Sequence, residues 1–301
     1  MFDDRGASRR RFLAAGACWL CASGIGRAAT SPVCEDVEAP PPVKLSAAEQ
    51  ERHSIFLLLA MALTYDGWTV DRSRPDLVAA YAQAEPGRSF PDYAGHNIGA
   101  LVVEPSGQVV SFALNRNVAL NSSLEHAEAR AVRRAIGIAN AEAGPEGPTR
   151  WSFGALLRRD CVYTTLEPCA QCAGIMDLAN LRQTIFAQED PTQRHMVNVI
   201  YNLQHRAGAG APLPIAGAFF PFWHRLAEAA RQFQLSVEGK SGPSGPTAFL
   251  ETIEAYRIYR DAAQLFETFE PRDAANTQSL AAARALRRRW SLWLPEGVGP
   301  V

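Results

Sequence analysis

Apolar positions in the first two thirds of the chain fall into segments of helix length and of strand length. Residues 46–65 predict a helix, because Ser46 and Glu49 form a capping box and the apolar run 55–63 follows. Further helical patterns lie at 75–83, 122–141 and 170–179. Short apolar runs bounded by turn residues predict strands at 97–103, 108–115, 160–164 and 183–187. This order predicts an α/β fold in which helices cover a sheet in three layers, α/β/α.

The pattern changes after residue 190, where strands no longer alternate with helices. Helical stretches follow at 192–205, 220–234, 247–268 and 275–292. Residues 29–45 are rich in proline and are interpreted as a linker. We therefore expect a domain over residues 46–190 and an α-helical C-terminal extension over residues 191–301.

The amino terminus has the pattern of a targeting segment. Residues 1–28 contain Arg9-Arg10-Arg11-Phe-Leu, then a short run of small and apolar residues, then Gly-Arg-Ala-Ala. This order is typical of a signal peptide, and the arginine pair favours the twin-arginine type. The alternative is a basic tail ahead of a short core helix. If residues 1–28 are a twin-arginine signal peptide, the twin-arginine translocase exports the folded protein, which is then periplasmic or secreted.

Net charge, hydropathy and cysteine content bear on nucleic-acid binding, membrane insertion and disulfide formation. Removal of residues 1–28 takes away five arginines and two aspartates, which changes the formal net charge from −1 to −4. An acidic mature chain disfavours nucleic acid as a partner without excluding it. We expect no stable membrane span, because no stretch reaches the length and apolar character of one. An oxidising destination would permit a Cys34–Cys161 bridge, which nothing in the sequence establishes.

Two short motifs carry the candidate chemistry. Pro168-Cys169-Ala-Gln-Cys172 begins a predicted helix, and two cysteines three positions apart on a helix share one side of it. The positive end of the helix dipole favours their thiolates. Two thiolates leave a zinc ion half-coordinated, and His126, at the start of another predicted helix, is the natural third ligand. The sequence therefore predicts a Zn²⁺ site made of His126, Cys169 and Cys172.

Three protein ligands leave the fourth position of tetrahedral zinc open, which is typical of a catalytic site. Zinc lowers the pKa of a bound water toward neutrality. Glu128 lies two residues after His126 and is the expected base and then acid, moving a proton to the leaving group. The alternative is a non-catalytic binding protein with structural zinc. An intact carboxylate at position 128 speaks against it, since a structural site does not use that group.

The order His-x-Glu followed by Pro-Cys-x-x-Cys is the zinc deaminase signature. Together with Ile98-Gly-Ala-Leu-Val-Val and Thr165-Leu-Glu-Pro-Cys-Ala-Gln-Cys-Ala-Gly, it gives the chain a resemblance to the cytidine deaminase-like superfamily. The likeness covers roughly residues 46–190 and is greatest to the branch of tRNA adenosine deaminases and guanine deaminases. The resemblance implies an α/β/α cytidine deaminase-like domain. It also implies substrate contacts, at Asn115, Ala127 and Asp190.

The resemblance implies hydrolytic deamination, with release of ammonia. We expect a small-molecule substrate, which is an amino-substituted nucleobase, a nucleoside or a related ring. The runner-up is a deaminase that acts on nucleic acid, as tRNA adenosine deaminases do. For Asp190, which precedes Pro191, a role in starting a turn competes with a role in substrate binding. The resemblance is also compatible with a homodimer.

Overall fold

The computed structural model describes residues 40, 42–143, 155–193, 195–206, 208 and 210–293. The expected signal segment, residues 1–28, lies outside the described residues, and so does Cys34. The predictions of export and of a Cys34–Cys161 bridge therefore stay predictions. The description that follows concerns the unit Val37–Val301 by itself.

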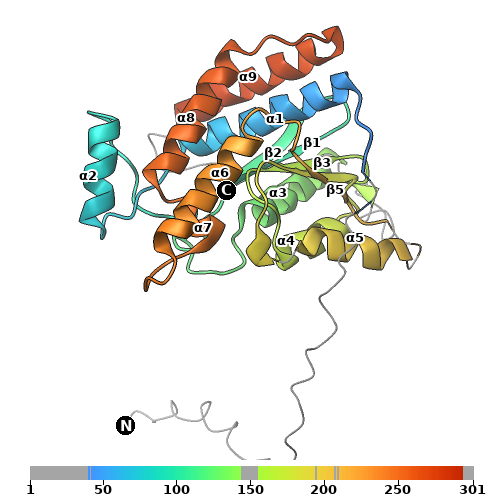
Figure 1. Cartoon of the computed structure of the whole chain (residues 1–301). Coiled ribbons are helices and arrows are strands. Elements are labelled where there is room, and N and C mark those ends of the chain that lie inside the picture. The colour runs from blue at the N-terminus through green and yellow to red at the C-terminus, as the bar shows by residue number, and fades with distance from the viewer. Residues whose placement is uncertain are drawn as a thin grey trace, which may run out of the picture. The chain divides into compact units, whose positions relative to one another are not determined.

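A five-stranded mixed sheet forms the centre of this unit (Figure 1). Its strands are β1 (Gly99–Val103), β2 (Val109–Leu114), β3 (Cys161–Thr164), β4 (Gln183–Phe186) and β5 (Leu213–Ala216). The strand order is β2-β1-β3-β4-β5. β1 is antiparallel to both of its neighbours, whereas β3, β4 and β5 run parallel. The amino-terminal end of β1 therefore lies beside the carboxyl-terminal ends of β2 and β3, along one edge of the sheet where strands end.

Helices cover both faces of the sheet, as Figure 1 shows. One layer contains α1 (Ala47–Asp66), α8 (Ile253–Thr268) and α9 (Thr277–Trp293), and the other contains α3 (Ala127–Glu142), α4 (Ala170–Leu178) and α5 (Met196–Arg206). The remaining helices are α2 (Pro75–Ala84), α6 (Trp223–Val237) and α7 (Gly245–Phe249), with 3₁₀ turns at Pro191–Gln193 and Ala274–Asn276. This arrangement confirms the predicted three-layer α/β fold with helices in the C-terminal part.

Helix α1 is the most deeply buried element. The capping box at its start is present, since Ser46 Oγ accepts a hydrogen bond from Glu49 N and the Glu49 carboxylate accepts one from Ser46 N. All residues from Ile55 to Leu63 have no exposed surface. A helix that is apolar all round needs partners on every side. The sheet packs against one side of α1, and α8 and α9 pack against others.

The structure departs from the sequence-based expectation in two places. Residues 213–216 form β5, a strand in a region expected to hold helices alone. It is four residues long and contains Pro214, which is tolerated because β5 is an edge strand. The helix expected from residue 122 begins instead at Ala127. Residues 122–125 form turns, in which Arg116 N donates to Glu125 O and Ser122 N donates to Asn117 O.

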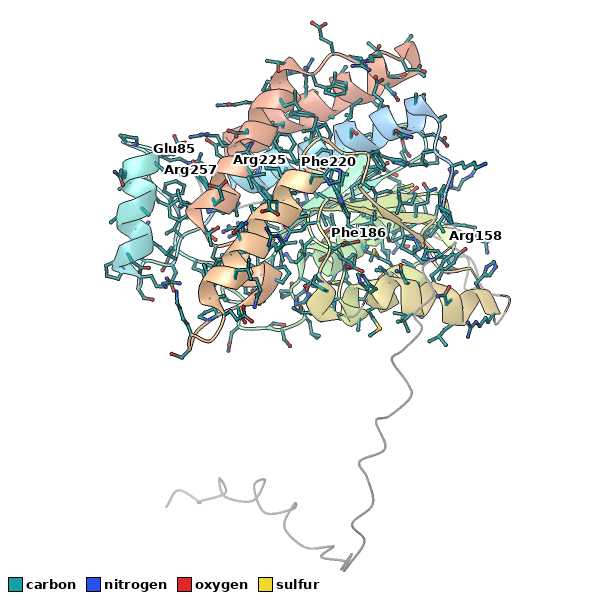
Figure 2. All side chains as sticks on the ribbon, in the orientation of Figure 1. Glu85, Arg158, Phe186, Phe220, Arg225 and Arg257 are labelled. Atoms are coloured by element: carbon teal, nitrogen blue, oxygen red, sulfur yellow. The ribbon has the colours of Figure 1, made fainter. Side chains whose placement is uncertain are left out.

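The interior side chains tie the C-terminal region to the sheet. Phe186 at the end of β4 and Phe220 before α6 are almost fully buried, whereas Arg225 on α6 reaches the surface and pairs with Asp261 (Figure 2). Phe112 on β2 meets Trp290 on α9 edge to face, with ring centroids 4.9 Å apart. In the described part of the chain, none of the helices is both long enough and apolar enough for a membrane crossing.

Candidate metal and catalytic site

One histidine and two cysteines converge between the starts of α3 and α4. The Sγ atoms of Cys169 and Cys172 lie 3.6 Å apart. His126 Nδ1 lies 3.4 Å from Cys169 Sγ and 3.6 Å from Cys172 Sγ. Three donor atoms from two distant segments therefore form a nearly equilateral triangle.

Local backbone geometry places each of these donors. His126 is the extended N-cap residue of α3, with φ −69° and ψ 153°. Cys169 has the same role at α4, where φ is −70° and ψ is 174°, and Cys172 follows in the first turn. Since α3 and α4 pack side by side on one face of the sheet, their first turns meet. The predicted ligands are thus brought together by two helix starts.

The triangle has the dimensions that tetrahedral zinc requires. With zinc–sulfur bonds of about 2.3 Å and a zinc–nitrogen bond of about 2.0 Å, ligand sulfurs stand about 3.8 Å apart and sulfur and nitrogen about 3.5 Å. The measured separations lie within about 0.2 Å of these values. Among the described residues, His126, Cys169 and Cys172 form a group of potential ligand atoms all within 4.8 Å of one another. The cluster can therefore hold zinc.

The two thiols differ in their protonation. The hydrogen bond from Cys172 lowers the pKa of Cys169 to about 4, and His126 adds to the effect. The same hydrogen bond and burial raise the pKa of Cys172 well above its usual value. Cys172 thus keeps its proton and donates it to the Cys169 thiolate. Metal binding requires both thiolates and would release that proton.

Glu128 lies beside the cluster with its carboxylate enclosed. Its residue is 4% exposed, and Oε2 lies 3.5 Å from Cys172 Sγ. Thr164, at the end of β3, donates a hydrogen bond of 3.2 Å to Oε1. Burial raises the pKa of this carboxyl group. A buried carboxyl that accepts hydrogen bonds and has a raised pKa is suited to taking up and giving back a proton.

Asn115 lies at the same edge of the sheet. Its backbone N donates to Ile98 O, one residue before β1, and Gly99 O accepts from Thr165 N just after β3. Asn115 is 4% exposed, and its Oδ1 accepts a hydrogen bond from Asn117 N. Its amide nitrogen is therefore the group left to face a ligand.

The other two predicted substrate residues have structural contacts. Ala127 is fully buried in the core at the first position of α3. Asp190 is 2% exposed, and its Oδ1 accepts hydrogen bonds from the backbone N and the hydroxyl of Thr192. This is the turn-forming arrangement that competes with the substrate role of Asp190.

Sequence reasoning missed two histidine–carboxylate pairs near the site. Glu167, two residues before Cys169, has a fully buried carboxylate that accepts from Asp190 N at 2.9 Å. His195 Nδ1 lies 3.2 Å from the other oxygen of Glu167. The second pair joins His96 to Glu251, 155 positions later. No local signal predicts pairs so distant along the chain, although Glu167 stands inside the Leu-Glu-Pro-Cys motif.

Comparisons with known proteins agree with the geometry of the cluster. Residues 74–188 match the family model described as the cytidine and deoxycytidylate deaminase zinc-binding region. A tRNA-specific adenosine deaminase of Agrobacterium fabrum is 34% identical over 94 residues, which are 31% of this chain and 53% of that protein. The chain thus spans about half the length of this curated relative.

Two solved structures are also similar. One comes from a study of A-to-I editing by tRNA:A34 deaminases, with 25% identity, a TM-score of 0.33 and coverage of 50% of this chain and 91% of that one. The other is guanine deaminase from Bacillus subtilis, with 22% identity, a TM-score of 0.26 and coverage of 39% and 59%. The three cluster residues and Glu128 all fall within the segment that the family model matches. Residues 74–188 of this chain are therefore similar to the zinc-binding region of cytidine and deoxycytidylate deaminases.

Proposed function

We propose that the protein is a zinc-dependent hydrolytic deaminase, which releases ammonia from an amino-substituted nucleobase, nucleoside or related heterocycle. The observation that carries this proposal is the triangle of His126, Cys169 and Cys172 with the enclosed carboxylate of Glu128 beside it. A triangle of three ligands leaves room for solvent at tetrahedral zinc. A structural site would not require the carboxylate.

His126, Cys169 and Cys172 would hold the metal. Zinc, when bound, supplies a Lewis acid that makes water nucleophilic near neutral pH. The overall reaction adds water to the carbon that carries the amino group, breaks the C–N bond and leaves a carbonyl and ammonia. Two protons must move during this exchange, so the site needs a group that both accepts and donates.

Glu128 is the group placed to carry those protons. Its ionised form accepts a proton from the attacking water, and its protonated form donates to the departing nitrogen. Burial favours the protonated form, whereas a backbone hydrogen bond of Glu128, the charge of His126 and the hydrogen bond from Cys172 favour the ionised form. These opposing influences are suited to a carboxyl group that must exist in both states during one turnover.

Asn115 is the residue proposed to orient the substrate ring. Its Oδ1 is occupied by Asn117 N, so its Nδ2 is available to donate to a ring acceptor. Asp190 is proposed to stand at the margin of the site, where Glu167 holds its backbone. Ala127 contributes shape alone, since it has no polar side-chain atom.

The direct test is ammonia release by purified, zinc-loaded protein from guanine, adenine, cytosine, their nucleosides, and short single-stranded RNA and DNA. We expect ammonia release from at least one of the bases or nucleosides. Glu128→Ala should keep zinc and lose release by about 10²-fold or more. Glu142→Gln is the matched control, because Glu142 is an exposed carboxylate on the same helix. Full activity in Glu128→Ala would contradict the mechanism.

A deaminase that acts on nucleic acid is the second candidate. The Agrobacterium fabrum relative is named as tRNA-specific, and it is 34% identical to this chain over 94 residues. The acidic balance outside residues 1–28 disfavours a polyanionic substrate. The RNA and DNA arms of the same screen decide between the two, since release from an oligonucleotide alone would favour this candidate.

We also propose that residues 1–28 direct export by the twin-arginine translocase to the periplasm or beyond. The proposal rests on the arginine pair ahead of a short apolar run. Replacement of Arg9 and Arg10 by lysine should retain the precursor in the cytoplasm, as cell fractionation would report. Unchanged export of this variant would refute the proposal.

A further inference from the structure

We infer that His96 is a substrate-recognition residue and that Glu251, from the C-terminal region, sets the orientation of its ring. The inference rests on the proposed function, and it names a residue and a substrate property that the zinc-binding motifs do not include. Glu251 lies outside the segment that matches the deaminase model, which ends at residue 188. The C-terminal region would thus contribute to specificity.

The loop that carries His96 lies directly against Asn115. Gly95 has φ +150°, and a Cβ placed there would come within 2.5 Å of Asn115 Oδ1. Ile98, two residues after His96, accepts the backbone hydrogen bond of Asn115. His96 and Asn115 also line the same small hollow. A ligand that reaches Asn115 is therefore close to the loop of His96.

Asn97, the residue after His96, fixes this loop by hydrogen bonds to Thr69 and to Leu250. The side-chain oxygen of Asn97 accepts from Thr69 N at 2.9 Å, and its Nδ2 donates to Thr69 O and to Leu250 O, each at 3.2 Å. Asn97 is 5% exposed, so these bonds are shielded from water. Leu250 is adjacent to Glu251, and the same short segment therefore holds both the loop and the imidazole.

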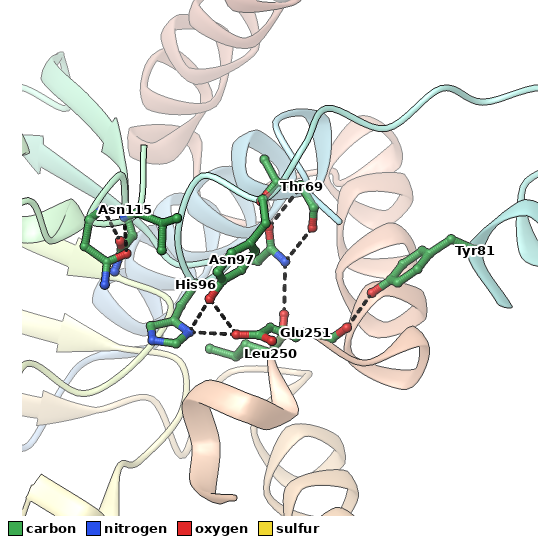
Figure 3. Close-up of polar contacts among 10 residues, drawn as sticks. Thr69, Tyr81, His96, Asn97, Asn115, Leu250 and Glu251 are labelled. Carbon is green, nitrogen blue, oxygen red and sulfur yellow. Dashed lines mark hydrogen bonds and ion pairs between the residues drawn. The ribbon is translucent and has the colours of Figure 1, made fainter. Parts of the chain in front are cut away.

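The ring of His96 is fixed through one nitrogen. Its Nδ1 lies 2.9 Å from Glu251 Oε1 and 2.9 Å from Tyr93 Oη (Figure 3). Tyr93 Oη in turn lies 2.6 Å from the same oxygen of Glu251. A carboxylate accepts both protons if the tyrosine hydroxyl and the Nδ1–H each donate to it. With both groups donating to Glu251, the single proton of the neutral His96 ring lies on Nδ1.

The opposite ring nitrogen is then an acceptor. Figure 3 shows the far edge of the His96 ring turned away from Glu251. Within the described part of the chain, both hydrogen bonds of the imidazole run through Nδ1. The His96 side chain is 32% exposed, so the ring is partly open to solvent, and the edge that carries Nε2 is the one that does not face Glu251. An accessible acceptor on a fixed ring recognises an N–H group.

Asn115 and His96 therefore offer opposite polarities. The first presents an N–H donor and the second a nitrogen lone pair, so a matching ring carries an acceptor and an N–H group. In each free base the nitrogen at the ribose position carries an N–H that the nucleoside lacks, whereas other N–H groups, such as N1–H of guanosine, are kept. We infer that His96 accepts from the N–H at the ribose position, which would make a free base rather than its nucleoside the substrate. A site built to bond an N–H group discriminates strongly against a ligand that lacks it.

The test compares guanine, adenine and cytosine with their nucleosides in ammonia-release kinetics. For the preferred base, Glu251→Gln and Tyr93→Phe should raise KM about tenfold or less, with kcat within about threefold, because Glu251 acts only through the imidazole. His96→Ala should raise KM for the base and reduce the preference for base over nucleoside. Glu254→Gln, an exposed carboxylate three residues from Glu251, is the matched control.

A binding measurement separates this inference from the proposed reaction. In zinc-loaded Glu128→Ala protein with ¹⁵N-labelled histidine, the His96 resonances should report the Nδ1–H tautomer, and a bound base should shift the Nε2 signal. Glu251→Gln should alter the tautomer balance. An Nε2 signal unmoved by all three bases, or unchanged KM and base preference in His96→Ala, would overturn the inference. Failure of every compound to release ammonia would instead overturn the proposed function alone.

Discussion

Cys172 Sγ and Glu128 Oε2 lie 3.5 Å apart, which places a proposed metal ligand directly beside the proposed proton carrier. The two residues come from different helices, α4 and α3. Each helix contributes through its first turn, where backbone N–H groups are free and the dipole is positive. Thiolates and a carboxylate are the groups such a junction stabilises, and they are the groups that zinc chemistry needs.

Loss of one sulfur ligand should remove the metal. We predict that Cys172→Ala reduces bound zinc from about one ion per chain to a small fraction of that, because two remaining protein ligands bind weakly. Zinc content after dialysis, measured by mass spectrometry, checks this. Cys161→Ala is the control, since Cys161 Sγ contacts Gln183 on the adjacent strand and belongs to no ligand cluster among the described residues. Equal zinc in both variants would contradict the assignment.

Gly95 should be intolerant of a side chain. A Cβ would lie 2.4 Å from Asn117 Oδ1 and 2.5 Å from Asn115 Oδ1, so Gly95→Ala must displace the proposed substrate-binding amide. We predict a loss of about tenfold or more in kcat/KM for a substrate found in the screen. Gly137→Ala is the matched control, because Gly137 lies in α3 with nothing within 4 Å of the added carbon. This change should preserve activity and stabilise the fold by about 0.5–1 kcal/mol.

His53 should make the fold sensitive to mild acid. It is 5% exposed in α1 and bonded to Tyr163 Oη, and burial lowers its pKa to about 4. The unfolded chain, with a histidine pKa near 6.5, then binds more protons between pH 6.5 and 4, so the free energy of unfolding falls as pH falls through this window. The full contribution is at most about 3.5 kcal/mol.

His53→Gln tests this dependence, because glutamine keeps a hydrogen-bonding group but does not titrate. Denaturant unfolding at several pH values should show a smaller loss of stability between pH 6.5 and 4 in the variant than in the parent protein. Identical pH profiles would show that His53 is not the responsible group.

Much of the fold could be predicted because its signals are local. The Ser46–Glu49 capping box and the apolar run after it predict α1, and short apolar runs between turns predict four of the strands. β5 escaped prediction because four residues that include Pro214 carry no strand pattern of their own. That strand is defined by pairing with β4, which is a tertiary effect.

The candidate site likewise has parts that local sequence signals predict and parts that only the fold shows. His126, Cys169 and Cys172 stand in two short motifs whose spacing suggests a metal, and the structure brings the three side chains together. The start of α3 was misplaced because Ser122 and Ser123 are good capping residues in isolation, whereas the turn before His126 is held by contacts to the segment after β2. The His96–Glu251 contact joins residues far apart in the sequence, and only the fold shows it.

The most direct test of the central claim is a crystal structure of zinc-loaded protein with anomalous diffraction measured at the zinc edge. We predict one zinc ion bound by His126 Nδ1, Cys169 Sγ and Cys172 Sγ, with a solvent molecule as the fourth ligand on the side of Glu128. A fourth protein side chain on the zinc, or zinc bound away from these three residues, would contradict the account.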